Sequence, residues 1–106
     1  MRHRRYYIRT LTTSGRPVPS TGGDLIVAAK DQTVDLDWEL IHRSSERLVI
    51  PQEPYDLEMS GPEGTFRGPA ILVRSDGRSH VFRGVGVLEG FDPAEFNGAL
   101  SDPELN

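Results

Sequence analysis

The chain has 106 residues, a net charge of −4 and no cysteine. That length supports one small domain, and about a quarter of the residues are Leu, Ile, Val or Phe, which is enough for a hydrophobic core. No apolar run approaches the roughly 20 residues of a membrane span, and the lack of cysteine excludes disulfides and thiolate chemistry. We therefore expect one β domain over residues 1–106, located in the cytoplasm and without a membrane partner.

Charge is unevenly distributed along the chain. Residues 1–16 carry five arginines and no acidic residue, whereas the rest of the chain carries all sixteen acidic side chains. Such a basic segment occurs in nucleic-acid-binding arms, but the acidic remainder would repel a phosphate backbone. We interpret the segment as a strand that pairs with acidic neighbours, and we expect no nucleic-acid partner.

Short apolar runs separated by glycine and proline predict a β protein. In chain order the predicted strands are 5–13, 24–30, 34–42, 47–50, 55–60, 65–75 and 78–88. Residues 14–23, rich in glycine, proline and serine, predict a mobile loop. The clearest alternation lies in the third strand, which turns one set of side chains to the core: Val34, Leu36, Trp38, Leu40 and His42.

The dipeptide Asp76-Gly77 predicts a hairpin with a two-residue type I′ turn. That turn would set three pairs opposite each other: Ser75 and Arg78, Val73 and His80, Ile71 and Phe82. The glycines that follow, Gly84, Gly86 and Gly90, predict a bulge or a sharp coil. They lack the spacing and the following helix of a dinucleotide-binding loop, so we expect no cofactor.

The end of the chain predicts one short helical turn that begins at Asp92, because an N-cap, a proline and a capping carboxylate follow in sequence. Residues 101–106 predict a frayed tail. The predicted fold class is all-β: a small antiparallel β-barrel or sandwich of about seven strands with a short C-terminal helical turn. The predicted core contains Val27, Leu36, Trp38, Ile50, Leu57, Val73, Val81 and Phe82.

Acidic residues form two stripes on the predicted strands. The stripes consist of Asp35, Asp37 and Glu39 on one strand and Asp56 and Glu58 on another. Alternation places them on an exposed sheet face, whereas acid–base catalysis needs carboxylates in a cleft. We interpret them as a solvated face and as candidate residues for contact with a basic protein partner.

The three histidines show no metal-ligand spacing, so we expect no metal site. His42 ends the apolar face that contains Trp38, and His80 flanks the predicted hairpin. Both are interpreted as structural histidines. In a closed barrel, however, they would line a pocket mouth with Tyr55 and Arg83, and these four residues with Trp38 are the candidate ligand-binding residues.

These patterns contain no catalytic constellation, so we expect no enzyme. The leading hypothesis is a non-catalytic binding or protein-interaction module. The alternative is a small-ligand-binding barrel or minor enzyme with a pocket near His42, Tyr55, His80 and Arg83. The long final hairpin also suggests a homodimer, in which it would pair across a two-fold axis.

Overall fold

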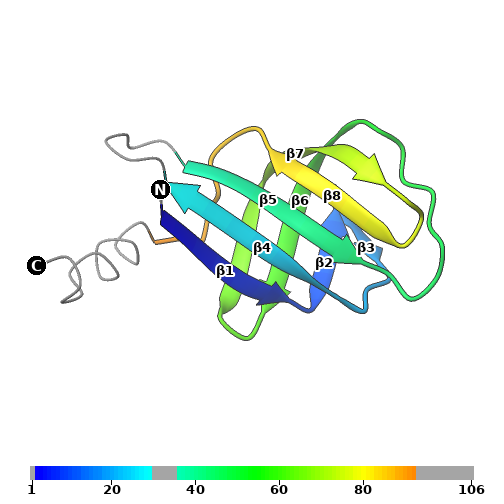
Figure 1. Ribbon diagram of the computed structural model, residues 1–106, viewed down its shortest axis with the longest axis horizontal. Coiled ribbons are helices and arrows are strands. Elements are labelled where there is room, and N and C mark those ends of the chain that lie inside the picture. Colours follow the sequence, from blue (N-terminus) through cyan, green and yellow to red (C-terminus); the bar gives the residue numbers. More distant parts are fainter. Residues whose placement is uncertain (1, 30–35, 93–106) are drawn as a thin grey trace, which may run out of the picture.

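The computed structural model describes residues 2–29 and 36–92, which fold into an all-β structure (Figure 1). Within these residues eight strands form: β1 (Arg2–Ile8), β2 (Thr10–Thr13), β3 (Arg16–Val18), β4 (Gly22–Ala29), β5 (Leu36–Arg43), β6 (Pro54–Gly61), β7 (Gly64–Ser75) and β8 (Ser79–Gly84). They make one antiparallel sheet, in the order β1-β4-β5-β8-β7-β6-β2-β3, that curls into a half-barrel. The predicted all-β class and antiparallel pairing are confirmed.

One bent strand links the two sides of the curled sheet. β1 pairs with β4, and beyond Arg9 the chain continues as β2 and pairs with β6 instead. The Arg9 N–H donates to the Ser60 carbonyl at 2.7 Å, which holds the bend against β6. The predicted strand 5–13 is therefore divided at Arg9, and the two sides of the sheet share one interior.

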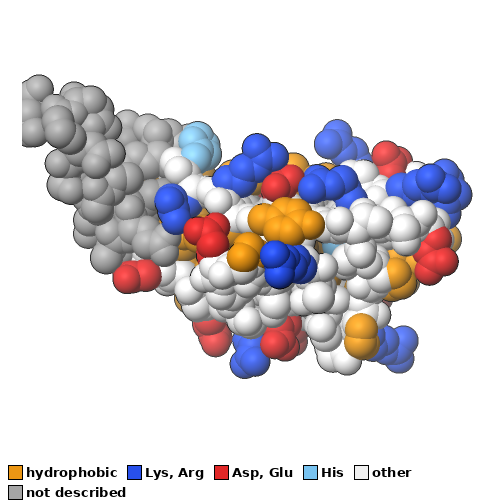
Figure 2. Space-filling model, turned by 90° about the horizontal axis from the view of Figure 1, so that it is seen from below, with side chains coloured by type: hydrophobic (Ala, Val, Ile, Leu, Met, Phe, Trp, Pro, Cys, Tyr) orange, Lys and Arg blue, Asp and Glu red, His pale blue; other side chains and the backbone are white. Residues whose placement is uncertain are grey.

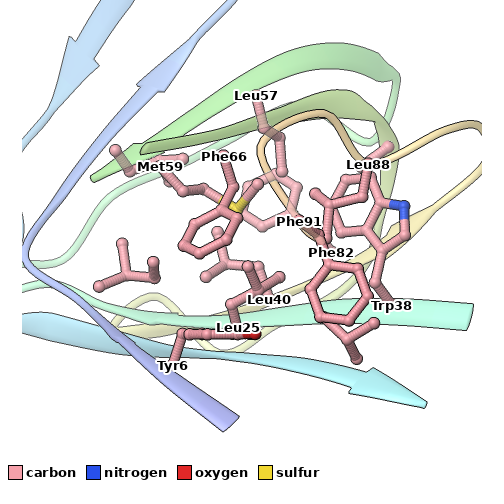
Figure 3. Close-up of a cluster of buried hydrophobic side chains, with 14 of the residues drawn as sticks. Tyr6, Leu25, Trp38, Leu40, Leu57, Met59, Phe66, Phe82, Leu88 and Phe91 are labelled. Atoms are coloured by element: carbon pink, nitrogen blue, oxygen red, sulfur yellow. The ribbon is translucent and has the colours of Figure 1, made fainter. Parts of the chain in front are cut away.

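That interior is filled by side chains from both sides of the sheet (Figure 3). At its centre the Tyr6 and Phe66 rings lie 4.7 Å apart, and both residues are at most 3% exposed. The predicted alternation of β5 is confirmed, because Trp38, Leu40 and His42 are all buried. Val34 and Asp35 lie outside the described residues.

The predicted core is correct for most of its members. Four predicted core residues are buried and two are half-buried against the core: Val27, Trp38, Leu57 and Phe82, then Leu36 and Ile50. The prediction is wrong for Val73 and Val81, which lie outside the core. Val81 alternates with the buried His80 and Phe82, so it lies on the opposite face of β8. Val73 directly follows the buried Leu72, so alternation places it on the outer face of β7, and it is 36% exposed.

The predicted hairpin register is also wrong. Ser75, not Val73, lies opposite His80, because the turn is centred one residue later than predicted: the Asp76 N–H donates to the Ser79 carbonyl at 3.1 Å. Farther from the turn the register shifts at a bulge between Leu72 and Arg74, so Leu72, not Ile71, lies opposite Phe82. The position of the turn brings the Ser75 hydroxyl to His80.

The turn of this hairpin differs from the predicted type. A type I′ turn needs positive φ at both central residues, and in Asp76-Gly77 only Gly77 has it, at 97°. The Asp76 carboxylate instead accepts the backbone N–H groups of Arg78 and Ser79 at 3.0 and 2.7 Å. These hydrogen bonds also hold the pKa of Asp76 below its usual range.

The structure also changes the predicted secondary structure of two segments, residues 14–23 and residues 47–50. The predicted loop 14–23 contains β3, because Ser14 (φ 46°) and Gly15 (φ 84°) both adopt the positive φ that a tight β2–β3 hairpin needs. Residues 47–50, predicted as a strand, make no ladder, and the Leu48 N–H donates to the Gly77 carbonyl at 2.8 Å. With the division at Arg9, these changes raise the strand number from the predicted value of about seven to eight.

Glycines make room for Trp38 at one end of the sheet. A Cβ atom at Gly84 would lie 2.1 Å from the indole Cε2, and one at Gly68 would lie 2.6 Å from Cζ2. The indole N–H donates to the Gly86 carbonyl at 2.9 Å. β8 ends at Gly84 and the chain then coils, so the predicted change of direction in this glycine-rich stretch is present.

The helical turn predicted from Asp92 and the tail 101–106 lie outside the described residues, apart from Asp92 itself. In the described part of the chain, no helix has the length and apolar character needed to cross a membrane.

We expect Gly84→Ala to lower the free energy of unfolding by about 1 to 3 kcal/mol, because a new methyl group would displace the buried indole. Urea unfolding followed by Trp38 fluorescence measures this. The neighbouring Val85→Ala is the control, since Val85 is 56% exposed and should change stability by less than about 0.5 kcal/mol. Equal stability of the two variants would show that Gly84 is not required for the packing of Trp38.

Candidate functional site

Two buried histidines lie side by side at the end of the sheet that carries the β7–β8 turn. His42 on β5 is opposite His80 on β8, and their rings stack with centroids 5.6 Å apart. Both residues are at most 1% exposed. We call this the histidine end of the sheet, and the opposite end, which holds Trp38, the tryptophan end.

Serine hydroxyls fix the protonation of His80. The Ser44 hydroxyl donates to the Glu46 carbonyl at 2.7 Å, so it can only accept from the His80 Nε2–H, which lies 3.4 Å away. The Ser75 hydroxyl lies 2.7 Å from Nδ1 and acts as its donor. This pattern describes a neutral imidazole with its proton on Nε2.

The same reasoning fixes the position of the proton on His42, but one ring nitrogen of His42 has no hydrogen-bond partner among the described residues. The Ser20 hydroxyl donates to the Val18 carbonyl at 2.9 Å and therefore accepts from the His42 Nε2–H at 2.7 Å. The second ring nitrogen, Nδ1, is buried and has no hydrogen-bond partner among the described residues. A proton added to Nδ1 would be a buried donor without an acceptor.

Burial keeps both imidazoles neutral at neutral pH. Loss of hydration lowers the pKa of His42 to about 4, and the nearby His80 and Arg43 contribute in the same direction. Burial also lowers the pKa of His80, although the Asp76 carboxylate opposes this shift. The pair is therefore a neutral polar cluster at the edge of an apolar core.

The Ser20–His42 contact resembles a hydrolytic dyad in distance only. A catalytic histidine needs a pKa near the working pH and a group that orients its second nitrogen, and His42 has neither among the described residues. The Ser20 proton is also directed to a backbone carbonyl. In the described part of the chain, no group of three His, Asp or Glu residues is placed to hold a metal ion.

A surface groove lies at the histidine end, between the β2–β3 hairpin and residues 48–55. It has a volume of about 560 Å³. One wall, from the hairpin, is Thr13, Ser14, Arg16, Pro17, Val18 and Pro19, and the other is Leu48, Val49, Ile50, Pro51, Glu53, Pro54 and Tyr55. We call it the β3 groove. Its most exposed apolar residue is Val49, at 98%.

The structure separates the five candidate ligand-binding residues into two groups. His42 and His80 are together at the histidine end, and Tyr55 lines the β3 groove there, with its hydroxyl donating to the Pro51 carbonyl at 2.6 Å. Trp38 and Arg83 instead line a groove of about 440 Å³ nearer the tryptophan end. The pocket mouth predicted from His42, Tyr55, His80 and Arg83 therefore does not form as one site.

The acidic stripes also lie apart. β5 and β6 are separated in the sheet by β8 and β7, so the two stripes do not merge into one acidic patch. Glu39 pairs with Arg83 at 3.8 Å, and Glu58 pairs with Arg67 at 3.3 Å. Asp37 and Asp56 are exposed, and Asp35 lies outside the described residues.

The N-terminal arginines are partly matched by acids, as predicted. Arg5 and Arg43 both contact the Asp24 carboxylate, at 3.2 and 3.1 Å, and Arg4 lies 3.7 Å from Glu63. The two guanidinium groups hold the pKa of Asp24 below its usual value, against the opposing effect of burial. On the face of the molecule that Figure 2 shows, basic and acidic side chains are interspersed.

Sequence reasoning missed the serines that hold the histidines and the hairpin wall of the groove. Ser20 and His42 are 22 positions apart, and His80 meets Ser44 across 36 positions, so no local pattern connects them. The hairpin had a local signal, because Ser14-Gly15 is a turn dipeptide that directly follows the β-branched residues Thr12 and Thr13.

The fold and site thus define a small all-β domain with a filled interior and a surface groove. Comparison with known proteins adds no relative: no protein-family model, no curated protein and no solved structure matches this chain.

We expect acid to destabilise the fold through His42. Its pKa is about 4 when folded against 6.5 when unfolded, so the unfolded state binds more protons between these values and stability falls as pH falls. The free energy of unfolding should be lower by about 2 kcal/mol at pH 5 than at pH 7, by urea titration. His42→Gln should flatten this dependence and His3→Gln, at an exposed site, should not. An equal slope in all three proteins would contradict the assignment.

Proposed function

We propose that this chain is a non-catalytic protein-interaction module that binds a short apolar peptide segment of a partner protein in the β3 groove. The observation that carries the proposal is the combination of a filled interior with a preformed apolar groove on the surface. The absence of cysteine is compatible with the cytoplasm, where we expect the module to act.

The interior favours a module over a small-ligand carrier. Side chains at the centre of the half-barrel are in direct contact. The ring nitrogens of His42 and His80 form hydrogen bonds with the hydroxyls of Ser20 and Ser75. The groove near Trp38 is large enough for a small ligand. However, two of the charged side chains that line it, Arg83 and Glu39, already form an ion pair with each other.

The β3 groove is suited to apolar side chains. Val18, Ile50 and Tyr55 pack against the core and form its floor, and four prolines stiffen its walls: Pro17, Pro19, Pro51 and Pro54. One arginine and one glutamate line it, so neither a strongly acidic nor a strongly basic segment is favoured. Rigid walls lower the entropy cost of binding a peptide.

Recognition would depend on side chains rather than on strand addition. β3 is the last strand in the sheet order of the described residues, and its register places Pro17 opposite Thr12, one step beyond the pair that flanks the turn. The backbone groups at that step point to the open edge, and proline has no N–H to offer a peptide. The edge is thereby protected against pairing with another strand.

The structure also bears on how a homodimer would form. Both strands of the long final hairpin lie inside the sheet, β8 between β5 and β7 and β7 between β8 and β6. The predicted pairing of this hairpin across a two-fold axis therefore lacks free strand edges over most of its length. A homodimer remains a prediction, and it would need another surface.

We expect a random peptide library, selected against the immobilised protein at pH 7.5, to yield apolar sequences that bind in the β3 groove. Val49→Asp should weaken the selected peptides by about tenfold or more, because a carboxylate would replace an apolar contact. Val87→Asp is the matched control, since Val87 is also strongly exposed, at 78%, but does not line the groove. Fluorescence polarisation with labelled peptides gives the affinities.

Two results would contradict this function. One is a selection that enriches no sequence. The other is a set of peptides whose affinity falls equally in Val49→Asp and Val87→Asp. Because both valines are exposed, neither substitution removes a core contact that would unfold the protein.

A further inference from the structure

We propose that the His42–His80 pair is a proton-controlled lock on the β3 groove: proton uptake by the pair releases the two walls of the groove from each other. The inference rests on the proposed function only for its biological meaning, because the lock is a property of the free protein. Its basis is the set of contacts that join each histidine to one wall.

His42 is joined to the hairpin wall. Its Nε2 contacts the Ser20 hydroxyl at 2.7 Å, and that hydroxyl donates to the Val18 carbonyl at 2.9 Å. The next residue, Thr21, donates its N–H to the Arg43 carbonyl at 2.9 Å, beside His42 on β5. One short chain of hydrogen bonds therefore holds the segment that follows β3 against the end of β5.

His80 is joined to the opposite wall by two routes. Through Ser44 it reaches the Glu46 carbonyl, at the start of the segment that becomes the wall. Through Ser75 it reaches the Gly77 N–H at 3.3 Å, and the Gly77 carbonyl accepts the Leu48 N–H at 2.8 Å. The stacked imidazoles are thus the point where the two walls meet.

A proton on either ring would weaken this point. On His42 it would occupy Nδ1, which has no acceptor among the described residues, and would place a cation 5.6 Å from a second imidazole. A proton added to His80 would occupy Nδ1, so that Nδ1 could no longer accept the hydrogen bond from the Ser75 hydroxyl. The titratable and charged groups described around the pair are Arg43 on β5, its partner Asp24 on β4, Tyr55 on β6, and Arg47 and Asp76 at the β7–β8 turn.

Of these groups Asp76 is the anion that favours a charged His80, and its carboxylate already accepts two backbone N–H groups. Relief of the buried charge therefore requires water, which reaches the pair if the groove walls separate. The 48–55 wall keeps its other ties, such as the Tyr55 hydroxyl to the Pro51 carbonyl. We therefore expect opening at the histidine end and not loss of the whole fold.

The test is amide hydrogen exchange on the free protein at pH 7 and pH 5, corrected for intrinsic rates. The reporters are the N–H groups of Thr21 and Leu48, one for each wall. Their protection should fall about 20-fold between the two pH values, which is the linkage expected for His42 alone. It should also stay below that of Leu40 in the central strand β5, which reports global unfolding.

One further amide and two variants complete the test. The Glu89 N–H, bonded to the Arg67 carbonyl at the tryptophan end, should keep its protection if it exchanges by local opening. His42→Gln should remove most of the pH dependence at Thr21 and Leu48, and the exposed His3→Gln should retain it. If His42→Gln does not fold, the proton resonances of the wild-type His42 ring provide the second measurement, because their midpoint must match that of the exchange.

The lock is overturned if Thr21 and Leu48 show the same protection at both pH values, or if their protection equals that of Leu40 at pH 5. It is also overturned if the pH dependence survives in the folded His42→Gln protein. None of these readouts involves a peptide, so failure of the lock and failure of peptide binding at pH 7.5 are separate results. In the cytoplasm the lock would stay closed and would open under acid stress.

Discussion

The bend at Arg9 is the feature on which the rest of this structure depends. Because β1 pairs with β4 and β2 pairs with β6, one continuous stretch of chain connects both sides of the curled sheet. The curled sheet of the described residues can then enclose one apolar interior, which Leu88 and Phe91 beyond β8 also help to fill. The neutral state of the histidines, the seating of Trp38 and the walls of the β3 groove all follow from this enclosure.

The two ends of the half-barrel are sealed by different physical means. At the tryptophan end an indole fits against backbone at Gly68 and Gly84, so packing density closes the structure. At the histidine end, imidazoles and serine hydroxyls close it through hydrogen bonds that require uncharged rings. Packing of apolar groups is insensitive to pH, whereas hydrogen bonds that require an uncharged imidazole are not.

Local sequence patterns predicted the features that depend on neighbours in the chain. The period of two in β5 placed His42 inside with Trp38 and Leu40, because alternation alone decides which face a side chain occupies. Patterns failed where long-range pairing decides. The bulge between Leu72 and Arg74 changed the partner of Phe82, and the strand order separated β5 from β6 and so divided the acidic stripes. The contacts of Ser20 with His42 and of Ser44 with His80 join residues 22 and 36 positions apart, so no local motif indicates them.

The distribution of polar groups supports the proposal that a partner binds in the β3 groove and not in the interior. Described ion pairs on the outer faces of the sheet, such as Glu58 with Arg67, match charges within the chain and leave little net field to attract an oppositely charged partner. Pro17 removes the donor that strand addition would use at the open edge of β3. What remains near this edge is apolar surface held in fixed positions by proline and by hydrogen bonds, and burial of such surface is the contribution that a partner would make.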